Sequence, residues 1–371
     1  MRLDRTNNSI FGRWWWTVDK INLAALVILM ALGLILVTAG SPPVARRLDL
    51  PPFHFVHRHQ MFLLAGLAIM FMVSLLPANA IRRLAVVGFA GSIAMMVLLP
   101  FFGMEVKGSH RWINLAGISI QPSEFMKPCF AVVMAWICAE NQRRVDFPGY
   151  RVSIAMYLVV VLLLIIQPDF GMTLTVSAVW GIQLFLAGLP IFWVVALAVL
   201  AAAGAMAAYT MLPHVARRIN SFLDPESGDN YQVDRSLEAF RNGGLFGRGP
   251  GEGEVKQFLP DSHTDFIFAV AGEEFGIIAC LLILGLFAFI LLRGLSRVWQ
   301  ENDLFVVVAV AGVLSQFGIQ AIVNMGVAVN LFPAKGMTLP FLSYGGSSVL
   351  SIALGMGMML ALTRTKYGKR H

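Results

Sequence analysis

The chain has 371 residues, of which 57% are hydrophobic and only 13% are charged, and its formal net charge is +7. Soluble domains are about 45–50% apolar and about 25% charged, so the composition excludes a water-soluble globule, a disordered chain and a nucleic-acid-binding domain. Most basic residues lie in short segments that flank apolar stretches, where positive charge orients membrane helices. The sequence therefore predicts a polytopic membrane protein.

Apolar stretches long enough to cross a bilayer recur along the whole chain. A hydrocarbon core about 30 Å thick requires about 20 apolar residues per helix. On that basis we predict an all-α integral membrane protein with about ten transmembrane helices in one bundle, forming a single domain over residues 1–371. The predicted spans are 21–40, 61–77, 84–102, 124–140, 152–167, 171–188, 190–211, 266–292, 304–328 and 346–363.

Both termini are predicted to lie in the cytoplasm. An even number of spans places them on one side of the membrane, and cytoplasmic segments carry an excess of Lys and Arg. Basic residues concentrate at both ends of the chain and in the loops on that side: Arg2, Arg5, Arg13, Lys20, Arg82, Arg83, Arg143, Arg144, Arg151, Arg293, Arg297, Arg364, Lys366, Lys369 and Arg370.

The loop between the third and fourth spans contains Arg111 next to Trp112. A guanidinium presents a planar fork of donors that suits phosphate oxygens, so Arg111 is a candidate ligand for a phosphate group. The alternative is an ordinary interfacial anchor, in which an aromatic ring and flanking cations hold the chain at the membrane surface.

Glu124 and Lys127 lie three residues apart at the start of the fourth span, and therefore on one face of a helix. An ionisable group inside a membrane costs about 3 kcal/mol unless it has a partner or a polar cavity. We predict that the two residues pair. The pair is either a structural device that helps the span enter the bilayer or part of a cavity that positions an anionic head group.

Asp169 follows Pro168 at the break between the fifth and sixth spans. A carboxylate at this position can accept hydrogen bonds from the first turn of the next helix and faces the positive end of that helix. We therefore favour a helix cap over a catalytic role for Asp169.

A long extracytoplasmic loop, about residues 212–265, connects the seventh and eighth spans. Within it, Val233, Leu237 and Phe240 fall at helical spacing, which predicts a short interfacial helix. The rest of the loop is the main place where polar chemistry has room outside the membrane.

The candidate catalytic residue is Asp265, at the end of this loop and the start of the eighth span. Its carboxylate is predicted to lie at the outer membrane edge, partly in water and partly against apolar residues, where it can serve as a base. The alternative is structural, because Ser262 and Asp265 have the spacing of a helix capping box. His263 lies between them and is a candidate substrate contact.

The segment that joins the ninth and tenth spans, residues 335–348, contains Pro and several Gly residues. Such interruptions leave backbone groups unpaired, which membranes tolerate where the chain lines a cavity or is buried in protein. Lys335, Ser343 and Tyr344 are therefore candidate lining residues. A tight entry into the last helix explains the glycines equally well.

Taken in order, these segments resemble the SEDS family (shape, elongation, division and sporulation), from about residue 20 to the last span. The KGMTLP sequence at 335–340 looks more like the division branch than the elongation branch. The motifs that carry the resemblance are KGSHRW at 107–112, QPSE at 121–124, QPDFG at 167–171, FLPDSHTDFIFA at 258–269, GEEFG at 272–276 and SYGGSS at 343–348.

The resemblance implies a peptidoglycan glycosyltransferase that polymerises lipid II at the septum, on the outer face of the cytoplasmic membrane, and releases undecaprenyl pyrophosphate. In this family the carboxylate at the position of Asp265 is the proposed catalytic base. A class B penicillin-binding protein and other divisome membrane proteins are the implied partners. The expected substrate-binding residues are Arg111, Glu124, Lys127, His263, Lys335, Ser343 and Tyr344.

Other functions are compatible with the same features. A flippase that moves lipid II across the membrane would share the charged cavity and the broken helices, and an elongation-type polymerase or a non-catalytic divisome scaffold would share the fold.

No resident cofactor is predicted, although a divalent cation could bind at the diphosphate. His54, His57 and His59 lack a nearby carboxylate or thiol to complete a metal site, so we predict a solvated juxtamembrane segment there.

Overall fold

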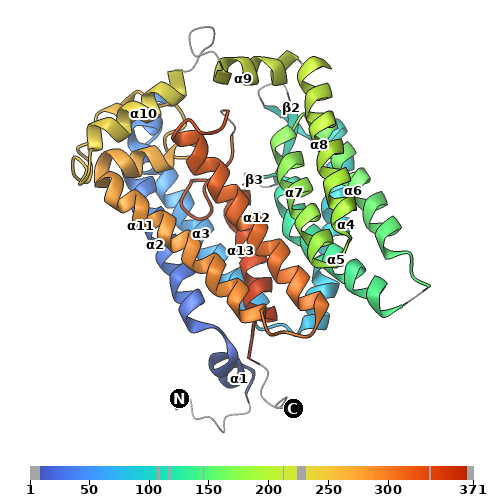
Figure 1. Ribbon diagram of the computed structural model, residues 1–371. Coiled ribbons are helices and arrows are strands. Elements are labelled where there is room, and N and C mark those ends of the chain that lie inside the picture. The colour runs from blue at the N-terminus through green and yellow to red at the C-terminus, as the bar shows by residue number, and fades with distance from the viewer. Residues whose placement is uncertain are drawn as a thin grey trace.

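The chain folds into a bundle of long helices (Figure 1). The computed structural model describes residues 9–106, 109–115, 118–144, 146–211, 213–223, 231–333 and 336–365. The elements are α1 (Ile10–Thr17), α2 (Lys20–Arg47), α3 (His54–Ser74), α4 (Ala78–Phe102), β1 (Met104–Val106), β2 (Ser109–Leu115), β3 (Ile118–Ile120), α5 (Pro122–Arg143), α6 (Gly149–Ile166), α7 (Phe170–Leu186), α8 (Ile191–Met211), α9 (Pro213–Leu223), α10 (Tyr231–Gly243), η1 (Val255–Gln257), α11 (Ile267–Val298), α12 (Leu304–Ala328) and α13 (Gly346–Leu362).

Each of the ten predicted spans corresponds to a helix. Among the described residues, seven of these helices are long and apolar enough to cross a bilayer: α2, α3, α4, α6, α8, α11 and α12. The helices α7 and α13 are apolar but have only 17 residues each, and α5 carries Glu124 and Lys127 near its start. The all-α membrane fold is confirmed, whereas ten crossings stay a prediction.

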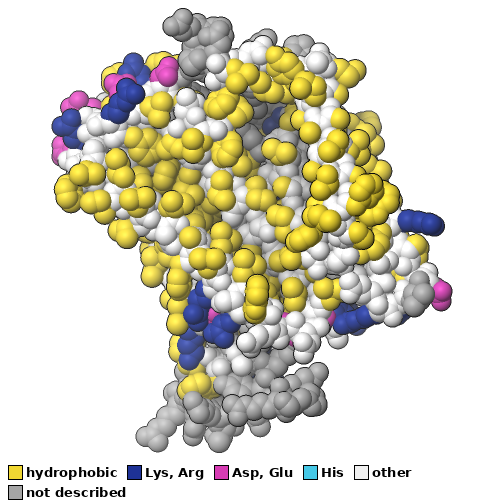
Figure 2. Space-filling model, in the orientation of Figure 1, with side chains coloured by type: hydrophobic (Ala, Val, Ile, Leu, Met, Phe, Trp, Pro, Cys, Tyr) yellow, Lys and Arg dark blue, Asp and Glu magenta, His cyan; other side chains and the backbone are white. Residues whose placement is uncertain are grey.

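The outer surface of the bundle is apolar, as contact with lipid requires. Figure 2 shows hydrophobic side chains over most of the visible face, with charged side chains gathered toward its two ends. Large side chains such as Val87 and Leu282 are 71% exposed, and the apolar stretch of α8 has no buried residues. A soluble monomer rarely exposes such continuous apolar surface.

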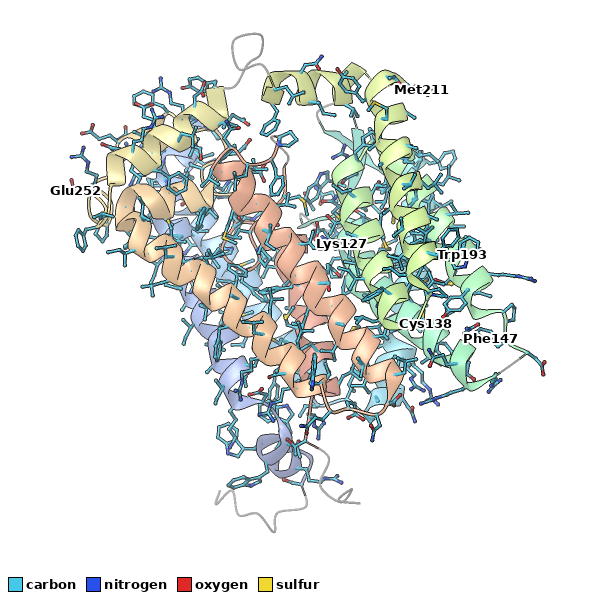
Figure 3. All side chains as sticks on the ribbon, in the orientation of Figure 1. Lys127, Cys138, Phe147, Trp193, Met211 and Glu252 are labelled. Carbon is cyan, nitrogen blue, oxygen red and sulfur yellow. The ribbon has the colours of Figure 1, made fainter. Side chains whose placement is uncertain are left out.

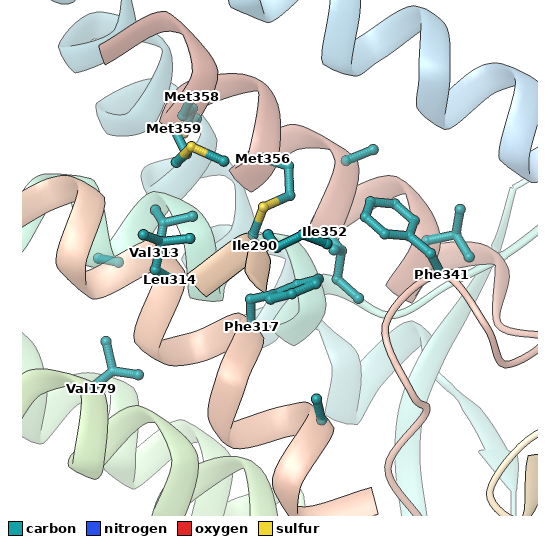
Figure 4. Packing of buried hydrophobic residues seen from close by; sticks show 14 of the residues in the cluster. Val179, Ile290, Val313, Leu314, Phe317, Phe341, Ile352, Met356, Met358 and Met359 are labelled. Carbon is teal, nitrogen blue, oxygen red and sulfur yellow. The ribbon is translucent and has the colours of Figure 1, made fainter. Parts of the chain in front are cut away.

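The interior of the bundle is built around α12 and α13. Figure 4 shows Phe317 of α12 beside Ile352 and Met356 of α13. Helices α3 and α13 pack closely because a glycine lies at their contact, where a Cβ on Gly346 would come within 2.6 Å of the Phe62 ring. Small residues at such contacts are the usual means by which membrane helices approach each other.

A three-stranded antiparallel sheet follows α4, where the sequence predicted only a loop. The strand order is β1-β2-β3, with Trp112 opposite Met104 and Ile113 opposite Ile120. The sheet leads the chain back to Pro122, the first residue of α5. In Figure 1, β2 lies toward the end of the bundle that also carries α9.

The predicted eighth span is wrong in one respect, because α11 is interrupted at Gly276. This residue has φ 79° and ψ 179°, a conformation that only glycine adopts without strain. Residues 267–274 before the break are almost completely buried, whereas residues 277–298 after it form a segment of membrane-spanning length. The predicted span 266–292 therefore contains a buried half-helix, which ends near Glu273 and Glu274, followed by a segment long enough to cross the membrane.

The segment after α10 supplies the backbone groups that the break leaves unpaired. The amide of Ile277 donates to the carbonyl of Gly244 (3.0 Å), and the amide of Arg248 donates to the carbonyl of Glu273 (2.9 Å). Because lipid offers no hydrogen bonds, irregular backbone at the membrane must be satisfied within the protein. The break is therefore stable only while this segment covers it.

Gly276→Ala is expected to lower the free energy of unfolding by about 1–3 kcal/mol from backbone strain alone. The added Cβ would also collide with the carbonyl of Leu245 and the amide of Gly247. Gly285→Ala in the same helix is the control, since no described atom beyond the neighbouring helix backbone lies within 4 Å of its Cβ position. Denaturant unfolding in detergent measures both, and equal stability of the two variants would contradict the strained break.

The short helix predicted in the long loop is present as α10 and packs on protein, whereas its place at the membrane interface stays a prediction. Gly243 lies against the backbone of Gly272, and the Phe240 ring fills the place where Gly272 would carry a Cβ. The carboxylate of Glu273 accepts hydrogen bonds from three successive backbone amides at residues 254–256, at 2.7–2.9 Å. The second half of the long loop is therefore a folded cap over the half-helix of α11.

Both ends of the described chain lie at one end of the bundle, and α9, α10 and the sheet lie toward the other (Figure 1). The amide of Thr365 donates to the carbonyl of Thr17 (2.9 Å). Nearby, the buried carboxylate of Asp19 caps α2 and accepts hydrogen bonds from Arg293 and Arg297. These contacts fix the N-terminal helices against the last part of α11.

Candidate functional site

A cavity of about 440 Å³ opens among α3, α5, α12, α13 and the sheet. The first residues of α13 line it, and α13 then runs toward the termini, so the cavity and the termini lie at opposite ends of this helix. The lining residues are Arg58, Phe62, Arg111, Trp112, Ser119, Gln121, Glu124, Asp169, Met172, Thr264, Asp265, Gln320, Gly336, Met337, Thr338, Tyr344, Gly345, Gly346 and Ser348.

Asp265 is half-buried and lines the cavity from the segment that precedes α11. Its carboxylate faces Gly336, where an added Cβ would lie 3.2 Å from Asp265 Oδ2. Because Gly336 has no side chain, the Asp265 carboxylate has space at this point of the cavity wall. Asp265 is thus partly exposed in the cavity and partly covered by protein, whereas its place at the wet outer edge of the membrane stays a prediction.

The capping-box alternative for Asp265 is wrong. Helix α11 begins at Ile267, its N-cap residue is Phe266, and no side chain bonds to its first turn as a cap. Ser262 instead donates a hydrogen bond to the carbonyl of Gly40 on α2 (2.9 Å). Asp265 is thus held at the cavity wall without serving as a helix cap.

Glu124 and Lys127 form the predicted ion pair, with Lys127 Nζ 3.0 Å from Glu124 Oε2. Their side chains are 10% and 1% exposed, and Lys127 points into the middle of the bundle (Figure 3). Lys127 Nζ also donates to Gln320 Oε1 (3.0 Å), and Ser351 Oγ donates to Glu124 Oε2 (3.3 Å). Only Glu124 of the two lines the cavity, so the pair is both a structural contact and a part of the cavity wall.

Arg111 connects the sheet to the turn between α6 and α7. Its Nε donates to the carbonyl of Gln167 and its Nη2 to that of Pro168, both at 2.7 Å, and its Nη1 lies 3.7 Å from Asp169 Oδ2. The predicted cap is confirmed, because Asp169 Oδ1 accepts a hydrogen bond from the amide of Met172 (3.0 Å). Arg111 therefore brings a positive charge into the cavity, and its hydrogen bonds to the α6–α7 turn hold the side chain in place.

The remaining predicted site residues divide into three groups. Tyr344 lines the cavity, whereas His263 and Ser343 lie behind its wall. The hydroxyl of Ser343 donates to the carbonyl of Thr264 (2.5 Å), which supports the wall next to the candidate base. Lys335 lies outside the described residues.

His263 is buried in an aromatic cluster instead of facing the cavity. Its ring centroid lies 4.5 Å from that of Phe55 and 5.4 Å from that of Tyr344. Burial lowers the pKa of His263 from its ordinary value of 6.5 to about 4, while Asp261 opposes and Arg47 adds to this effect. The imidazole is therefore neutral at physiological pH.

The free energy of unfolding is expected to fall as the pH drops from about 6.5 to about 4. In this range the unfolded chain binds a proton at His263, whereas the folded chain does not. The two pKa values correspond to a loss of about 3 kcal/mol at the acid end. Denaturant unfolding at a series of pH values measures this slope. His263→Phe keeps the ring packing and should make this slope shallower, so an unchanged slope in that variant would contradict the assignment.

Sequence reasoning missed two amide side chains of α12. Gln320 Nε2 donates to the carbonyl of Thr338 (2.9 Å), and Asn324 Nδ2 donates to the carbonyl of Asp265 (2.8 Å). The readable signal was their spacing of one helical turn within an apolar span. Amides inside a membrane are costly unless they find partners.

Arg58 and His59 at the start of α3 were also misjudged. Arg58 lines the cavity, although it was not among the predicted site residues. His59 is completely buried, so the prediction of a solvated juxtamembrane segment is wrong for this residue. Helix α3 begins at His54, seven residues before the predicted start of the span at 61. Part of the predicted juxtamembrane segment therefore lies on this helix and faces the protein interior.

Solved structures share this architecture over almost the entire chain. A chain of a peptidoglycan synthase complex, from a study of polymerization and crosslinking, superposes with a TM-score of 0.77 at 26% identity, covering 94% of this chain and 98% of that one. The rod shape determining protein RodA of Thermus thermophilus gives a TM-score of 0.70 at 25% identity, covering 96% and 99%.

Sequence relatives and a family model agree with the structural matches. A probable peptidoglycan glycosyltransferase FtsW of Caulobacter vibrioides is 45% identical over 365 residues, covering 98% of this chain and 94% of that protein. A protein of the same description from Coxiella burnetii is 35% identical, covering 94% and 96%. The model of the FtsW/RodA/SpoVE family, described as cell cycle protein, matches residues 20–368. The chain therefore belongs to the FtsW/RodA/SpoVE family.

Proposed function

We propose that the chain is a peptidoglycan glycosyltransferase that polymerises lipid II. The observation that carries the proposal is the half-buried carboxylate of Asp265 at the wall of a cavity that also holds the cations Arg58 and Arg111. Glycosyl transfer from a diphosphate needs a base for the acceptor and positive charge for the leaving group. Relatives over the full chain length carry the name of this activity.

Asp265 is the proposed general base. Its carboxylate accepts the proton of the glucosamine 4-hydroxyl of the incoming lipid II as that oxygen attacks the muramyl anomeric carbon of the growing chain. The new C–O bond forms while the bond from the anomeric carbon to the diphosphate breaks, and undecaprenyl pyrophosphate leaves with the bonding electrons. Attack from the side opposite the leaving group inverts the anomeric centre.

The cations of the cavity stabilise the diphosphate in this proposal. Arg111 is suited to the role because contacts with the α6–α7 turn hold its guanidinium in place, so little reorganisation is needed when charge develops. Glu124 and Tyr344 line the same cavity and shape the substrate site, and Lys127 acts through Glu124. A divalent cation at the diphosphate would, like the arginines, stabilise the negative charge of the leaving group.

The cavity is proposed to face the outside of the cytoplasmic membrane, with both termini in the cytoplasm. The excess of Lys and Arg at the end of the bundle that holds both termini supports this orientation. The names of the sequence relatives favour the division branch over the elongation branch, and hence a location at the septum. A class B penicillin-binding protein is the proposed partner, because the similar solved chain comes from a complex that joins polymerization to crosslinking.

Purified full-length chain, combined with its cognate class B penicillin-binding protein, should convert fluorescent lipid II into glycan polymers that separate on a gel. The partner alone is the control and should give none. A lipid II transporter is the second candidate, because the charged cavity and the broken α11 are also typical of transporters. Movement of lipid II across vesicle membranes without polymer would favour the transporter and contradict the polymerase.

A further inference from the structure

We propose that Asn324 is a positioning residue that fixes the location of Asp265 in the cavity. The inference rests on the proposed function, in which Asp265 is the base. Asn324 itself does not line the cavity, so its effect on the reaction passes through the backbone that carries Asp265.

The side-chain amide of Asn324 joins two irregular segments of the cavity wall. Its Nδ2 donates to the carbonyl of Asp265 (2.8 Å) and to the carbonyl of Met337 (2.6 Å). The first segment precedes α11, and the second lies between α12 and α13 and includes Gly336, which faces the Asp265 carboxylate. One buried amide, 1% exposed, thus sets the spacing between the carboxylate and the wall opposite it.

The backbone at Asp265 depends on such side chains because no helix holds it. Helix α11 starts only at Ile267 and has no side-chain cap. The carbonyl of Thr264 is held by Ser343 and the carbonyl of Asp265 by Asn324. A buried carbonyl without a partner costs about 1–3 kcal/mol, so loss of the Asn324 donor is expected to let the segment shift toward another partner.

The neighbouring Gln320 extends the same arrangement by one turn of α12. It accepts a hydrogen bond from Lys127 and donates to the carbonyl of Thr338. The two amides together connect the buried ion pair on α5 with both loops of the cavity wall. Asn324 is the one whose donor reaches the backbone of the candidate base, which makes it the sharper test.

Gln316 provides a matched control one turn before Gln320. It is also a buried amide of α12, 6% exposed, and its side-chain oxygen has no hydrogen-bond partner among the residues that the structure describes. It does not line the cavity. Gln316→Leu therefore reports what the loss of a buried amide in this helix costs when no wall segment depends on it.

The test compares Asn324→Leu, Asn324→Gln and Gln316→Leu in the full-length chain with its transpeptidase partner. A displacement of about 1 Å at a catalytic group lowers rates by about 10²-fold, so Asn324→Leu should lower kcat by about 10–100-fold with KM changed less than about twofold. Asn324→Gln keeps the donor and should recover part of kcat, and Gln316→Leu should keep wild-type kcat. An unchanged kcat in Asn324→Leu, or an equal loss in Gln316→Leu, would overturn the proposal.

A second readout separates this inference from the proposed function. Asp265→Cys can be labelled with a water-soluble maleimide, with and without Asn324→Leu, and the labelling rate is expected to change severalfold when the amide is removed. Thermal unfolding in detergent identifies any variant that fails to fold, and Asn324→Gln then carries the comparison. If wild-type protein makes no polymer, the polymerase proposal fails, while an unchanged labelling rate is the result that defeats the positioning role.

Discussion

Asp265→Asn is expected to lower the rate of lipid II polymerisation by about 10²–10⁴-fold, the usual contribution of a general base. The amide has nearly the size of the carboxylate and fits the same space beside Gly336, but it cannot accept the proton of the attacking hydroxyl. The cavity and its cations stay in place, so binding of lipid II should change little. The effect should therefore appear in kcat and leave KM nearly constant.

The control for this prediction is Asp261→Asn. Asp261 lies four residues earlier in the same segment and is also half-buried, but it does not line the cavity. Its φ of 52° is compatible with Asn, which tolerates the left-handed region. This variant should polymerise lipid II at a rate within about threefold of wild type. A threefold difference corresponds to about 0.6 kcal/mol of activation free energy.

Full activity of Asp265→Asn in the same assay would show that another group takes the proton. Complementation in cells adds an independent measurement, because a non-catalytic divisome scaffold would support division equally well with Asn at this position. A variant that inserts into the membrane, binds its partner and fails to support division would exclude the scaffold. Comparison of detergent unfolding curves guards against simple loss of the fold.

Much of the fold could be predicted because lipid imposes a length and a polarity on each span. All ten predicted spans are helices, and the pairing of Glu124 with Lys127 followed from their spacing of three residues. These features depend on local sequence, since a helix repeats every 3.6 residues. The break at Gly276 was missed because a glycine inside a predicted span does not by itself mark an interruption, although two acidic residues, Glu273 and Glu274, lie just before it.

The errors at the site arise from contacts between distant parts of the chain. Ser262 matched a local capping pattern, but its hydroxyl bonds to Gly40, 222 residues away. The partner of the Asp265 carbonyl is Asn324, 59 residues away. Sequence spacing cannot rank such partners against local ones. The readable hints were chemical, since a buried amide inside an apolar helix is costly unless it finds hydrogen-bond partners.

The ion pair on α5 sets up the second large expected effect. Lys127 is almost completely buried and has two polar partners, Glu124 Oε2 and Gln320 Oε1, each at 3.0 Å. Removing one member of a buried pair leaves the other charge uncompensated, which costs about 3–5 kcal/mol, whereas replacing both members with neutral groups of similar size costs much less. Lys127→Met is therefore expected to destabilise the protein more than the double change does.

The measurement is a double-mutant cycle with Glu124→Gln, Lys127→Met and the combined variant, read by denaturant unfolding in detergent and by polymerisation rate. Lys127→Met should lose about 3–5 kcal/mol of stability, and the combined variant should recover most of that loss because no unpaired charge remains. Activity should stay low in all three variants, since Glu124 lines the cavity and needs its charge and position there. Additive losses of stability and of activity would mean that the two side chains are energetically independent in spite of their contact, and the role of Lys127 in holding Glu124 at the cavity would then be wrong.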